Sequence, residues 1–542
     1  MYSNNEPGAV GKIRIISIEK VDDLNVSTVN CLLSEYDDAT STEVQKTIWF
    51  SVDKQWSKGL CSDLSDAYII GILSYCMRKR YDIYSDVPMT NVLKHNLVEY
   101  LMPLICKADM TLRQPNLFVD TVSEETIRKG DAIGTGASCG LDSMHAIWHY
   151  YNHEKEFKLT HLCINNVGAF GCYSDSEKSK DLAYTRSEQF SRDLHLPLIR
   201  TNSNIHEVIK QSHYLTNTYT TLFAVYMLRY HWKKYYIGSC GGLLPTGFTL
   251  NENASEDSSH YEIISFPALS TNNLKIIGEG EDCTRFEKLK DISDFHIAKK
   301  YLYSCHREET NCGKCLKCMA NLLCIDALGE LNQYRQSYDI DYYKKNRKMY
   351  LMWLIENKVE LGQAWMEDTK AVFLSKKDVD YLDCLKSEKL IKNAVKDFNN
   401  KSNPDSAFAV FNKYMIISSR AAKYYALCLL TGFGCEIDKS GCLDVLKRLF
   451  NEKALPGALI LTYIDLLIES NDSADVEEAL TLLNHYAYKK KGPGALFKLG
   501  TMLIEGNILE ENKEEGIRLI RKSAKLGYGP ALSYLTTFHI ED

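Results

Sequence analysis

A glycine- and serine-rich stretch, Gly134 to Ser143 (GTGASCGLDS), carries the residue types best suited to chemistry in this chain. It follows the short run Arg128–Ile133 and precedes Met144–Tyr151, where apolar residues recur with helical spacing. Glycines allow a tight turn and a close approach to a ligand, and the free N–H groups at a helix start attract anions. The pattern predicts a strand, a turn and a helix that together cradle phosphate. A strand–helix turn that binds no ligand is the alternative.

Ser138 and Ser143 add hydroxyls to this predicted cradle, and Asp142 adds a carboxylate. The Gly-Lys-Ser/Thr ending of a Walker-type loop is absent. The stretch resembles instead the S-G-G-x-D-S loop of the PP-loop ATP pyrophosphatases, with Cys139 in place of the first glycine. This resemblance implies that Ser138, Asp142 and Ser143 act in catalysis, with Asp142 orienting Mg²⁺. It also implies an ATP-binding set made of Gly134, Gly136, Ser138, Cys139, Gly140, Asp142 and Ser143. A thiol at a helix start can have a lowered pKa, so a nucleophilic Cys139 is a rival interpretation.

Four closely spaced cysteines form a second motif: Cys305, Cys312, Cys315 and Cys318. Two overlapping C-x-x-C steps and a cysteine just upstream can bring four sulfurs to one tetrahedral point, the geometry that Zn²⁺ favours. Gly313 suits the turn between two such ligands. Four thiolates leave no open coordination position, so the pattern predicts a structural Zn²⁺ site. An iron–sulfur cluster or a redox dithiol remains an alternative.

The loop and the cysteine motif together resemble the 7-cyano-7-deazaguanine synthase family, whose members use ATP to activate a carboxylate and convert it, through an amide, to a nitrile. Thr284–Leu289 is similar to that family's T-K-x-E-I-I segment, and the residues around Cys305 and Cys312 match its S-C and C-G-x-C blocks. The resemblance covers roughly residues 126–330. It implies that Arg285, as a catalytic residue, and Glu287 line the site. Leu243–Leu269, where the acceptor pocket is expected, has no match, although it contains Asn251, Glu252, Asp257 and His260.

From Arg128 onward, strand-like and helix-like segments alternate, which predicts an α/β domain with a parallel sheet and helices on both faces. The resemblance implies the adenine nucleotide alpha hydrolase-like form of that fold. Ligands of such sheets bind beyond the carboxyl ends of the strands. Two further segments are therefore expected beside the loop, Asn165–Gly168 and Gly238–Gly242. Gly168, Gly238 and Ser239 are candidate nucleotide contacts, and simple tight turns are the alternative.

The chain is expected to contain three further parts. Residues 1–125 predict a small α+β domain, with strands at Lys12–Lys20, Ser27–Leu33 and Thr47–Val52 and helices at Asp63–Lys79 and Val92–Ile105. Residues 126–330 form the PP-loop-like domain with its zinc knuckle. Residues 331–419 predict a helical connector, in which the polar stretch Lys386–Asp405 contains a plausible loop at Asn399–Pro404. Residues 420–542 predict an α-solenoid.

The solenoid is predicted from an internal repeat. Similar apolar segments begin at Ala421, Ala458, Ala495 and Ala531, about 37 residues apart, with amphipathic segments between them. They resemble Sel1-like repeats of the tetratricopeptide class, in which small residues recur as Gly432, Gly434, Gly500 and Gly506 do here. Solenoid surfaces commonly bind proteins, so a protein partner is expected for this part. Docking on the catalytic part, or dimer formation, is the alternative.

Composition limits the remaining possibilities. The 542 residues are 45% hydrophobic and 25% charged, as in ordinary globular proteins, and the net charge of −7 gives no footprint for nucleic acid. The N-terminus lacks the pattern of a signal peptide, and no apolar run predicts a membrane span. Eighteen cysteines without such a signal favour thiols or metal ligands in a reducing compartment, and therefore a cytoplasmic location.

These observations predict an ATP-dependent adenylating enzyme, a carbon–nitrogen ligase acting on a small-molecule or peptide acceptor. A carboxylate or amide would be activated as an adenylate, with release of pyrophosphate, and a nitrogen nucleophile would then displace AMP. Two alternatives remain. One is a nucleotide-sensing scaffold that recruits a partner through the solenoid, with bacterial defence as one setting for such a role. The other is a tRNA sulfur-transfer enzyme, against which the lack of a basic patch argues.

Overall fold

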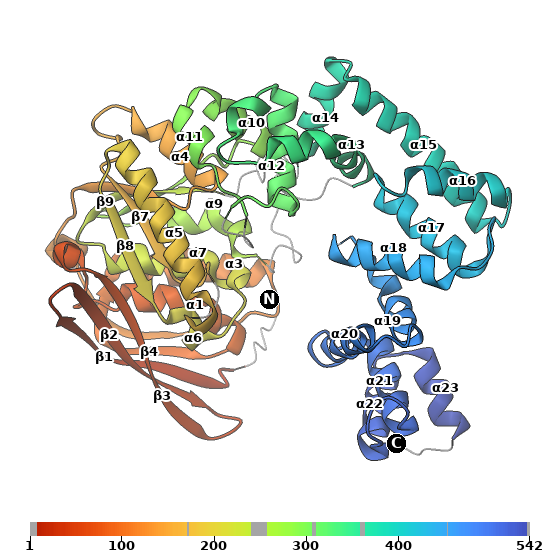
Figure 1. Cartoon of the computed structure of the whole chain (residues 1–542). Helices are drawn as coiled ribbons and strands as arrows, with labels where there is room; N and C mark the ends of the chain where they lie inside the picture. The colour runs from red at the N-terminus through yellow and green to blue at the C-terminus, as the bar shows by residue number, and fades with distance from the viewer. Residues whose placement is uncertain are drawn as a thin grey trace, which may run out of the picture. The chain divides into compact units, whose positions relative to one another are not determined.

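The computed structural model describes residues 8–170, 173–239, 257–305, 310–357, 364–452 and 454–538. The chain divides into two compact units (Figure 1). Unit 1 comprises Met1–Lys345 and Val359–Lys376, and unit 2 comprises Asn346–Lys358 and Lys377–Asp542. Unit 1 is an α/β structure, whereas the described part of unit 2 is helical.

A single ten-stranded sheet runs through the described part of unit 1, in the order β10-β9-β6-β7-β8-β3-β2-β1-β4-β5. Its strands in chain order are β1 (Gly11–Asp22), β2 (Val26–Asp37), β3 (Thr42–Asp53), β4 (Asp82–Thr90), β5 (Leu117–Val122), β6 (Ala132–Gly136), β7 (His161–Asn166), β8 (Leu198–Ser203), β9 (Trp232–Gly238) and β10 (Lys275–Glu279). Pairing is parallel from β10 through β8, antiparallel from β8 through β1, and parallel again from β1 to β5. The expected α/β class is therefore confirmed, with a mixed but mostly parallel sheet.

The chain order of the parallel strands reverses at β6. From β6 the chain builds outward through β7 and β8, and it then returns to the other side of β6 to form β9 and β10. In sheets of this kind the crevice beyond the carboxyl ends of the strands opens at such a reversal. The glycine- and serine-rich loop follows β6 directly, so the topology places it at that point.

The expected boundary near residue 125 does not divide the sheet. Strand β3, from the N-terminal stretch, pairs antiparallel with β8, with Phe50 opposite Ser203 and Val52 opposite Thr201. The backbone N–H of Trp49 also donates to Asn204 Oδ1 at 2.8 Å. Phe50 and Val52 are buried in this register, so the pairing extends one shared core instead of leaving a separate α+β domain.

The described part of unit 1 also contains α-helices, connected to the strands by turns and loops. In chain order they are α1 (Asp66–Lys79), α2 (Asn91–Asn96), α3 (Met102–Ala108), α4 (Leu141–Tyr151), α5 (Tyr173–Leu194), α6 (Ile205–Ile209), α7 (His213–Met227), α9 (Glu262–Ala268), α10 (Arg285–Asp291), α11 (His296–Tyr301), α12 (Leu316–Leu328) and α14 (Trp365–Ser375). α13 (Ile340–Glu356) begins in unit 1 and ends in unit 2. Long apolar helices such as α1 and α7 are buried along most of their length, because they pack against each other and against the sheet core.

Unit 2 begins its helical array before residue 420. Its helices after α13 are α15 (Val379–Asn399), α16 (Pro404–Tyr414), α17 (Ser419–Thr431), α18 (Lys439–Asn451), α19 (Ile460–Glu469), α20 (Ser473–Asn484), α21 (Pro493–Glu505), α22 (Lys513–Lys525) and α23 (Gly529–Thr537). The loop expected at Asn399–Pro404 lies between α15 and α16, where residues 400–403 are not helical. The polar stretch before it belongs to α15, which buries a narrow stripe that includes Ile391 and Ala394 and leaves its polar residues on the remaining face.

The apolar repeat segments of unit 2 are helices that pack in pairs with the amphipathic segments, as α17 with α18 and α21 with α22. Gly432 and Gly506 end α17 and α21 in the left-handed conformation, where glycine is favoured. Gly500 lies against α22, where an added Cβ would be 2.8 Å from the carbonyl oxygen of Gly516. In the described residues, no helix combines the length and apolarity required to cross a membrane.

Candidate functional site

The loop after β6 presents two hydroxyl groups at the start of α4. Ser138 is exposed, and its Oγ lies 3.0 Å from Ser143 Oγ and accepts a hydrogen bond of 3.3 Å from the Gly140 N–H. Gly140 is the N-cap residue of α4, and Ser143 Oγ donates to its carbonyl oxygen at 3.0 Å. A Cβ on Gly136 would meet nothing within 4 Å, so open space adjoins this strand end. The arrangement can present hydroxyls and helix N–H groups to an anion.

Cys139 occupies a conformation that normally favours glycine. Its φ of 61° lies in the left-handed region, and its side chain is buried. Burial raises the pKa of the Cys139 thiol to about 12. A thiol with that pKa is almost fully protonated near neutral pH, which argues against a nucleophilic Cys139. Cys139 adopts a left-handed backbone conformation at the position where the resembling loop has glycine.

Asp142 is paired with a buried lysine that the sequence interpretation did not single out. Lys288 Nζ, on α10, lies 2.9 Å from Asp142 Oδ1 and donates at 2.6 Å to the carbonyl oxygen of Ser239. The Lys288 side chain is only 1% exposed. Burial by itself raises the pKa of Asp142, but the positive charges of Lys288, Arg285 and Lys317 outweigh it, and the pKa is lowered. Although the loop has no Walker lysine, a distant element supplies a cation beside it.

The strand-end glycines have clear packing roles. A Cβ on Gly238 would lie 2.3 Å from the Asp142 carbonyl oxygen, so only glycine lets the end of β9 approach the start of α4 this closely. Gly134 similarly makes room for the ring of Trp232, and Gly168, with φ of 122°, lies against His206. Gly238 therefore lies beside the loop as expected. A nucleotide contact by Gly168 or Gly238 stays a prediction.

Ser239 forms a hydrogen-bonded pair with the buried carboxyl group of Glu262. Ser239 is 3% exposed, and its Oγ donates to Glu262 Oε2 at 3.2 Å. Burial raises the pKa of Glu262 to about 8, and the nearby negative charges of Glu281 and Asp142 act in the same direction. Glu262 begins α9, within the segment expected to line the acceptor pocket. Asn251 and Glu252 of that segment lie outside the described residues.

Arg285 and Glu287 have different roles. Arg285 is half-buried at the start of α10, and its Nη1 donates to Asn321 Oδ1 at 2.8 Å. Glu287 caps α10, because its carboxylate accepts from the Thr284 N–H at 2.7 Å while Thr284 Oγ1 accepts from the Glu287 N–H at 3.2 Å. This capping box accounts for Glu287 without a ligand, whereas Arg285 acts electrostatically on Asp142.

The four cysteines of the second motif come together. The Sγ atoms of Cys305, Cys312, Cys315 and Cys318 all lie within 4.8 Å of one another. Gly313 turns the chain with φ of 70°, and the N–H groups of Lys314 and Cys315 donate to Cys312 Sγ at 3.4 and 3.3 Å. A hydrogen bond with Cys318 lowers the pKa of the Cys315 thiol. The cluster could hold a metal ion, and the described cysteines are free of disulfides.

A buried asparagine, which the sequence interpretation missed, organises the cysteine segment. Asn311 Oδ1 accepts from the N–H groups of Ser304 and Cys305 at 2.8 and 3.2 Å, and its Nδ2 donates to the carbonyl oxygens of Leu302 and Ser337 at 2.9 and 2.8 Å. These contacts join residues that precede and follow the cluster. No sequence signal separated Asn311 from an ordinary loop asparagine.

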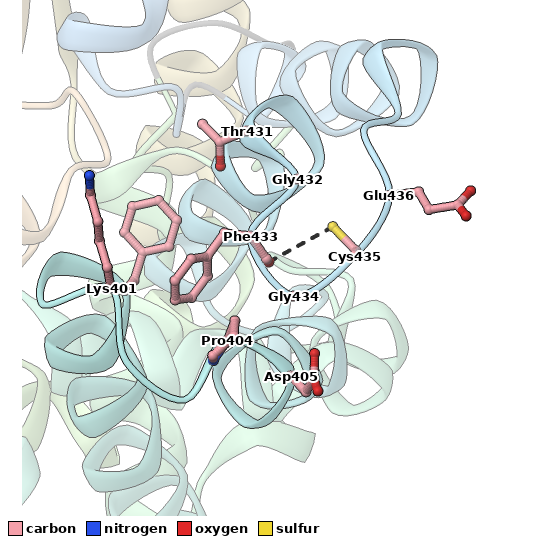
Figure 2. A pocket seen from close by; sticks show the side chains of 10 residues that line it. Lys401, Pro404, Asp405, Thr431, Gly432, Phe433, Gly434, Cys435 and Glu436 are labelled. Carbon is pink, nitrogen blue, oxygen red and sulfur yellow. Dashed lines mark hydrogen bonds between the residues drawn. The ribbon is translucent and has the colours of Figure 1, made fainter.

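A separate cavity of about 990 Å³ lies in unit 2, next to the start of α16 and the loop after α17 (Figure 2). Gly434, with φ of 72°, brings that loop close to α16, since an added Cβ would be 2.3 Å from the Pro404 carbonyl oxygen. The lining residues are Phe398, Lys401, Pro404, Asp405, Thr431, Gly432, Phe433, Gly434, Cys435 and Glu436. Aromatic rings and charged side chains together could receive a peptide segment.

In comparisons with known proteins, no protein-family model matches the chain and no curated protein has a significantly similar sequence.

Proposed function

We propose that the protein is an ATP-dependent adenylating enzyme of the PP-loop type, a carbon–nitrogen ligase that binds ATP at the loop between β6 and α4. The observation that carries the proposal is the grouping of Ser138, Ser143 and the start of α4 with the cations that act on Asp142. Hydroxyls, helix N–H groups and positive side chains are the ligands that a triphosphate requires. Gly136 and the exposed Ser138 leave room for it.

Each residue has a proposed task. Ser138 and Ser143 donate hydrogen bonds to phosphate oxygens, and Lys288 and Arg285 balance the charge that develops on them. Lys288 contacts Oδ1 of Asp142, and the Asp142 carboxylate would also hold Mg²⁺. Gly134, Gly136, Gly140 and Cys139 shape the loop, and Gly168, Gly238 and Ser239 lie on neighbouring segments of the proposed site. Mg²⁺, when bound, would neutralise phosphate charge.

The proposed reaction has two steps. An oxygen of the acceptor's carboxylate or amide attacks the α-phosphorus of ATP, forming an O–P bond while the bond to pyrophosphate breaks. A nitrogen nucleophile then attacks the activated carbon, the C–O bond to AMP breaks, and the nitrogen loses a proton. Positioning and charge neutralisation supply the catalysis, so no covalent enzyme intermediate is required.

We assign Zn²⁺ to the four-cysteine cluster as a structural ion. Four thiolates fill a tetrahedral sphere, and backbone N–H donors to a ligand sulfur, as at Cys312, stabilise thiolate charge. The acceptor, a small molecule or a peptide, is assigned to the side of the crevice near Glu262. A protein partner is assigned to unit 2, where the cavity in Figure 2 offers a contact surface.

The proposal is tested by pyrophosphate and AMP release from ATP and Mg²⁺ with candidate carboxylated deazapurines or peptides. Ser138→Ala, Asp142→Asn and Lys288→Gln are each expected to lower the rate by at least about tenfold, because each removes a donor or charge at the reacting phosphates. Lys290→Gln, an exposed change on the same helix as Lys288, serves as the matched control and should leave the rate unchanged. ATP binding without turnover in the presence of every acceptor class, together with partner capture by unit 2, would support a nucleotide-sensing scaffold instead.

A further inference from the structure

A second cluster of metal-ligating side chains is formed by residues other than the four cysteines. His145, Cys283 and Asp291 each offer one ligand atom, and these atoms all lie within 4.8 Å of one another. His145 Nε2 is 3.1 Å from Asp291 Oδ2. The three residues come from α4, from the turn before α10 and from the end of α10, so tertiary folding alone brings them together.

Glu279 orients the histidine of this cluster. Its Oε2 lies 3.0 Å from His145 Nδ1, and both side chains are almost fully buried, at 4% and 3% exposure. When Nδ1–H donates to this carboxylate, the lone pair of the neutral ring is on Nε2, which faces Asp291. A carboxylate behind a ligating histidine is the usual outer-shell partner at metal sites, and it raises the basicity of the ligand nitrogen. Trp148 packs against the same ring, with centroids 5.3 Å apart.

The chemistry of the three ligands suits one divalent ion. One nitrogen, one sulfur and one oxygen form a mixed set of the kind that Zn²⁺ accepts. A Cys283 thiolate and an Asp291 carboxylate together balance its two positive charges. Asp291 is 38% exposed, so an ion can enter from solvent and keep water in a fourth position. We propose that His145, Cys283 and Asp291 form a second Zn²⁺ site with an open coordination position, separate from the four-cysteine cluster.

The site adjoins the start of the same helix that carries the phosphate-binding loop. His145 follows Asp142 by three residues, so the two share one face of α4. Gly280 lies between the two regions, since an added Cβ would be 2.7 Å from Lys288 Cε and 3.1 Å from His145 Nδ1. The proposal rests on the ligand geometry and is independent of ATP chemistry.

The test counts zinc in the full-length protein. Wild type and variants are loaded with Zn²⁺, desalted and analysed by mass spectrometry for zinc per chain, with circular dichroism to confirm folding. Cys283→Ser and Asp291→Asn are each expected to hold one equivalent fewer than wild type, and Cys312→Ser combined with Cys283→Ser should hold fewer still. His153→Gln, which changes a histidine just after the end of α4, controls for adventitious binding and should match wild type.

A second probe follows the thiolate directly. With Co²⁺ in place of Zn²⁺, the sulfur-to-metal charge-transfer absorption should fall in Cys283→Ser by the share that this site contributes, while the four-cysteine cluster keeps its own share. In Asp291→Asn the absorption of this site should fall only as far as the variant loses Co²⁺ from it. Because Asp291 is partly exposed, its variant is expected to fold even if the cysteine variant does not. Zinc content equal to wild type in the folded Asp291→Asn variant overturns the proposal and leaves His145 as a cation held between Glu279 and Asp291.

Discussion

The backbone N–H of Tyr303 donates a hydrogen bond of 2.8 Å to the carbonyl oxygen of Cys139. Tyr303 stands two residues before Cys305, so one short segment joins the loop to the cysteine cluster. On its other side the loop is held by α5, where Ser187 Oγ donates to the Ala137 carbonyl oxygen at 2.7 Å. The loop is therefore braced from two elements, and one brace depends on the cluster.

Loss of the metal should consequently disturb the loop. In Cys312→Ser we expect loss of the cluster's metal, a fall of at least about 2 kcal/mol in the free energy of unfolding, and slower pyrophosphate release. Denaturant unfolding, metal analysis and the release assay measure the three effects. Cys435→Ser, a half-buried cysteine of unit 2, is the control and should keep both metal and rate. Wild-type stability in a Cys312→Ser protein that has lost the cluster's metal would show that the cluster does not brace the fold.

Cys139→Ala separates a structural thiol from a reactive one. The variant keeps the strained φ of 61° and loses a buried sulfur, so we expect a loss of about 1 kcal/mol in stability. Pyrophosphate release should stay within about threefold of wild type, because a thiol with a pKa near 12 supplies no nucleophile. The measurements are thermal unfolding and the release assay. A folded variant with no turnover would restore the nucleophile hypothesis.

The loop and the cysteine cluster could be predicted from sequence because their residues are neighbours in the chain. Strand, turn and helix follow from local pattern, and the cysteine spacing already limits how the sulfurs can meet. Lys288 could not be assigned, because its position beside Asp142 depends on the packing of α10 against α4. The contact of Tyr303 with Cys139 was missed because it also joins segments far apart in the chain.

The pairing of β3 with β8 shows the same limit at the level of the fold. The alternating pattern of Thr47–Val52 predicts a strand, but it does not say which edge that strand will join. Residues 1–125 were therefore expected to form a domain of their own.

Gly136 and Gly238 should respond differently to the same added methyl group. Gly238→Ala places a Cβ 2.3 Å from the Asp142 carbonyl oxygen and 2.8 Å from the Ser143 N–H nitrogen, so we expect a loss of about 2 kcal/mol or more in stability. Gly136→Ala meets nothing within 4 Å and should keep or slightly raise stability, while weakening ATP binding if phosphates lie there. Thermal unfolding and an ATP-binding titration compare the two. Equal melting temperatures for both variants would mean that β9 does not approach α4 so closely.

Glu262 should make stability depend on pH. Burial raises its pKa from 4.5 to about 8, so the folded state keeps a proton that the unfolded chain releases above about pH 4.5. Between about pH 4.5 and 8 the folded state therefore binds more protons than the unfolded chain. The contribution of Glu262 to the free energy of unfolding is fully present at low pH and is lost as the pH rises through about 8. Each pH unit in the window corresponds to about 1.4 kcal/mol at most.

Glu262→Gln removes this titration while keeping a side chain of the same size. We expect the variant and wild type to differ little near pH 5, and the variant to gain on wild type by at least about 2 kcal/mol by pH 8. Urea unfolding at several pH values measures the difference, which isolates Glu262 from the other titrating groups. Glu19→Gln, at an exposed position of β1, is the control for the substitution itself. A flat difference for Glu262→Gln would mean that Glu262 is ionised in the folded protein, and its buried contacts with Ser239 and Thr218 would then have to stabilise a full negative charge.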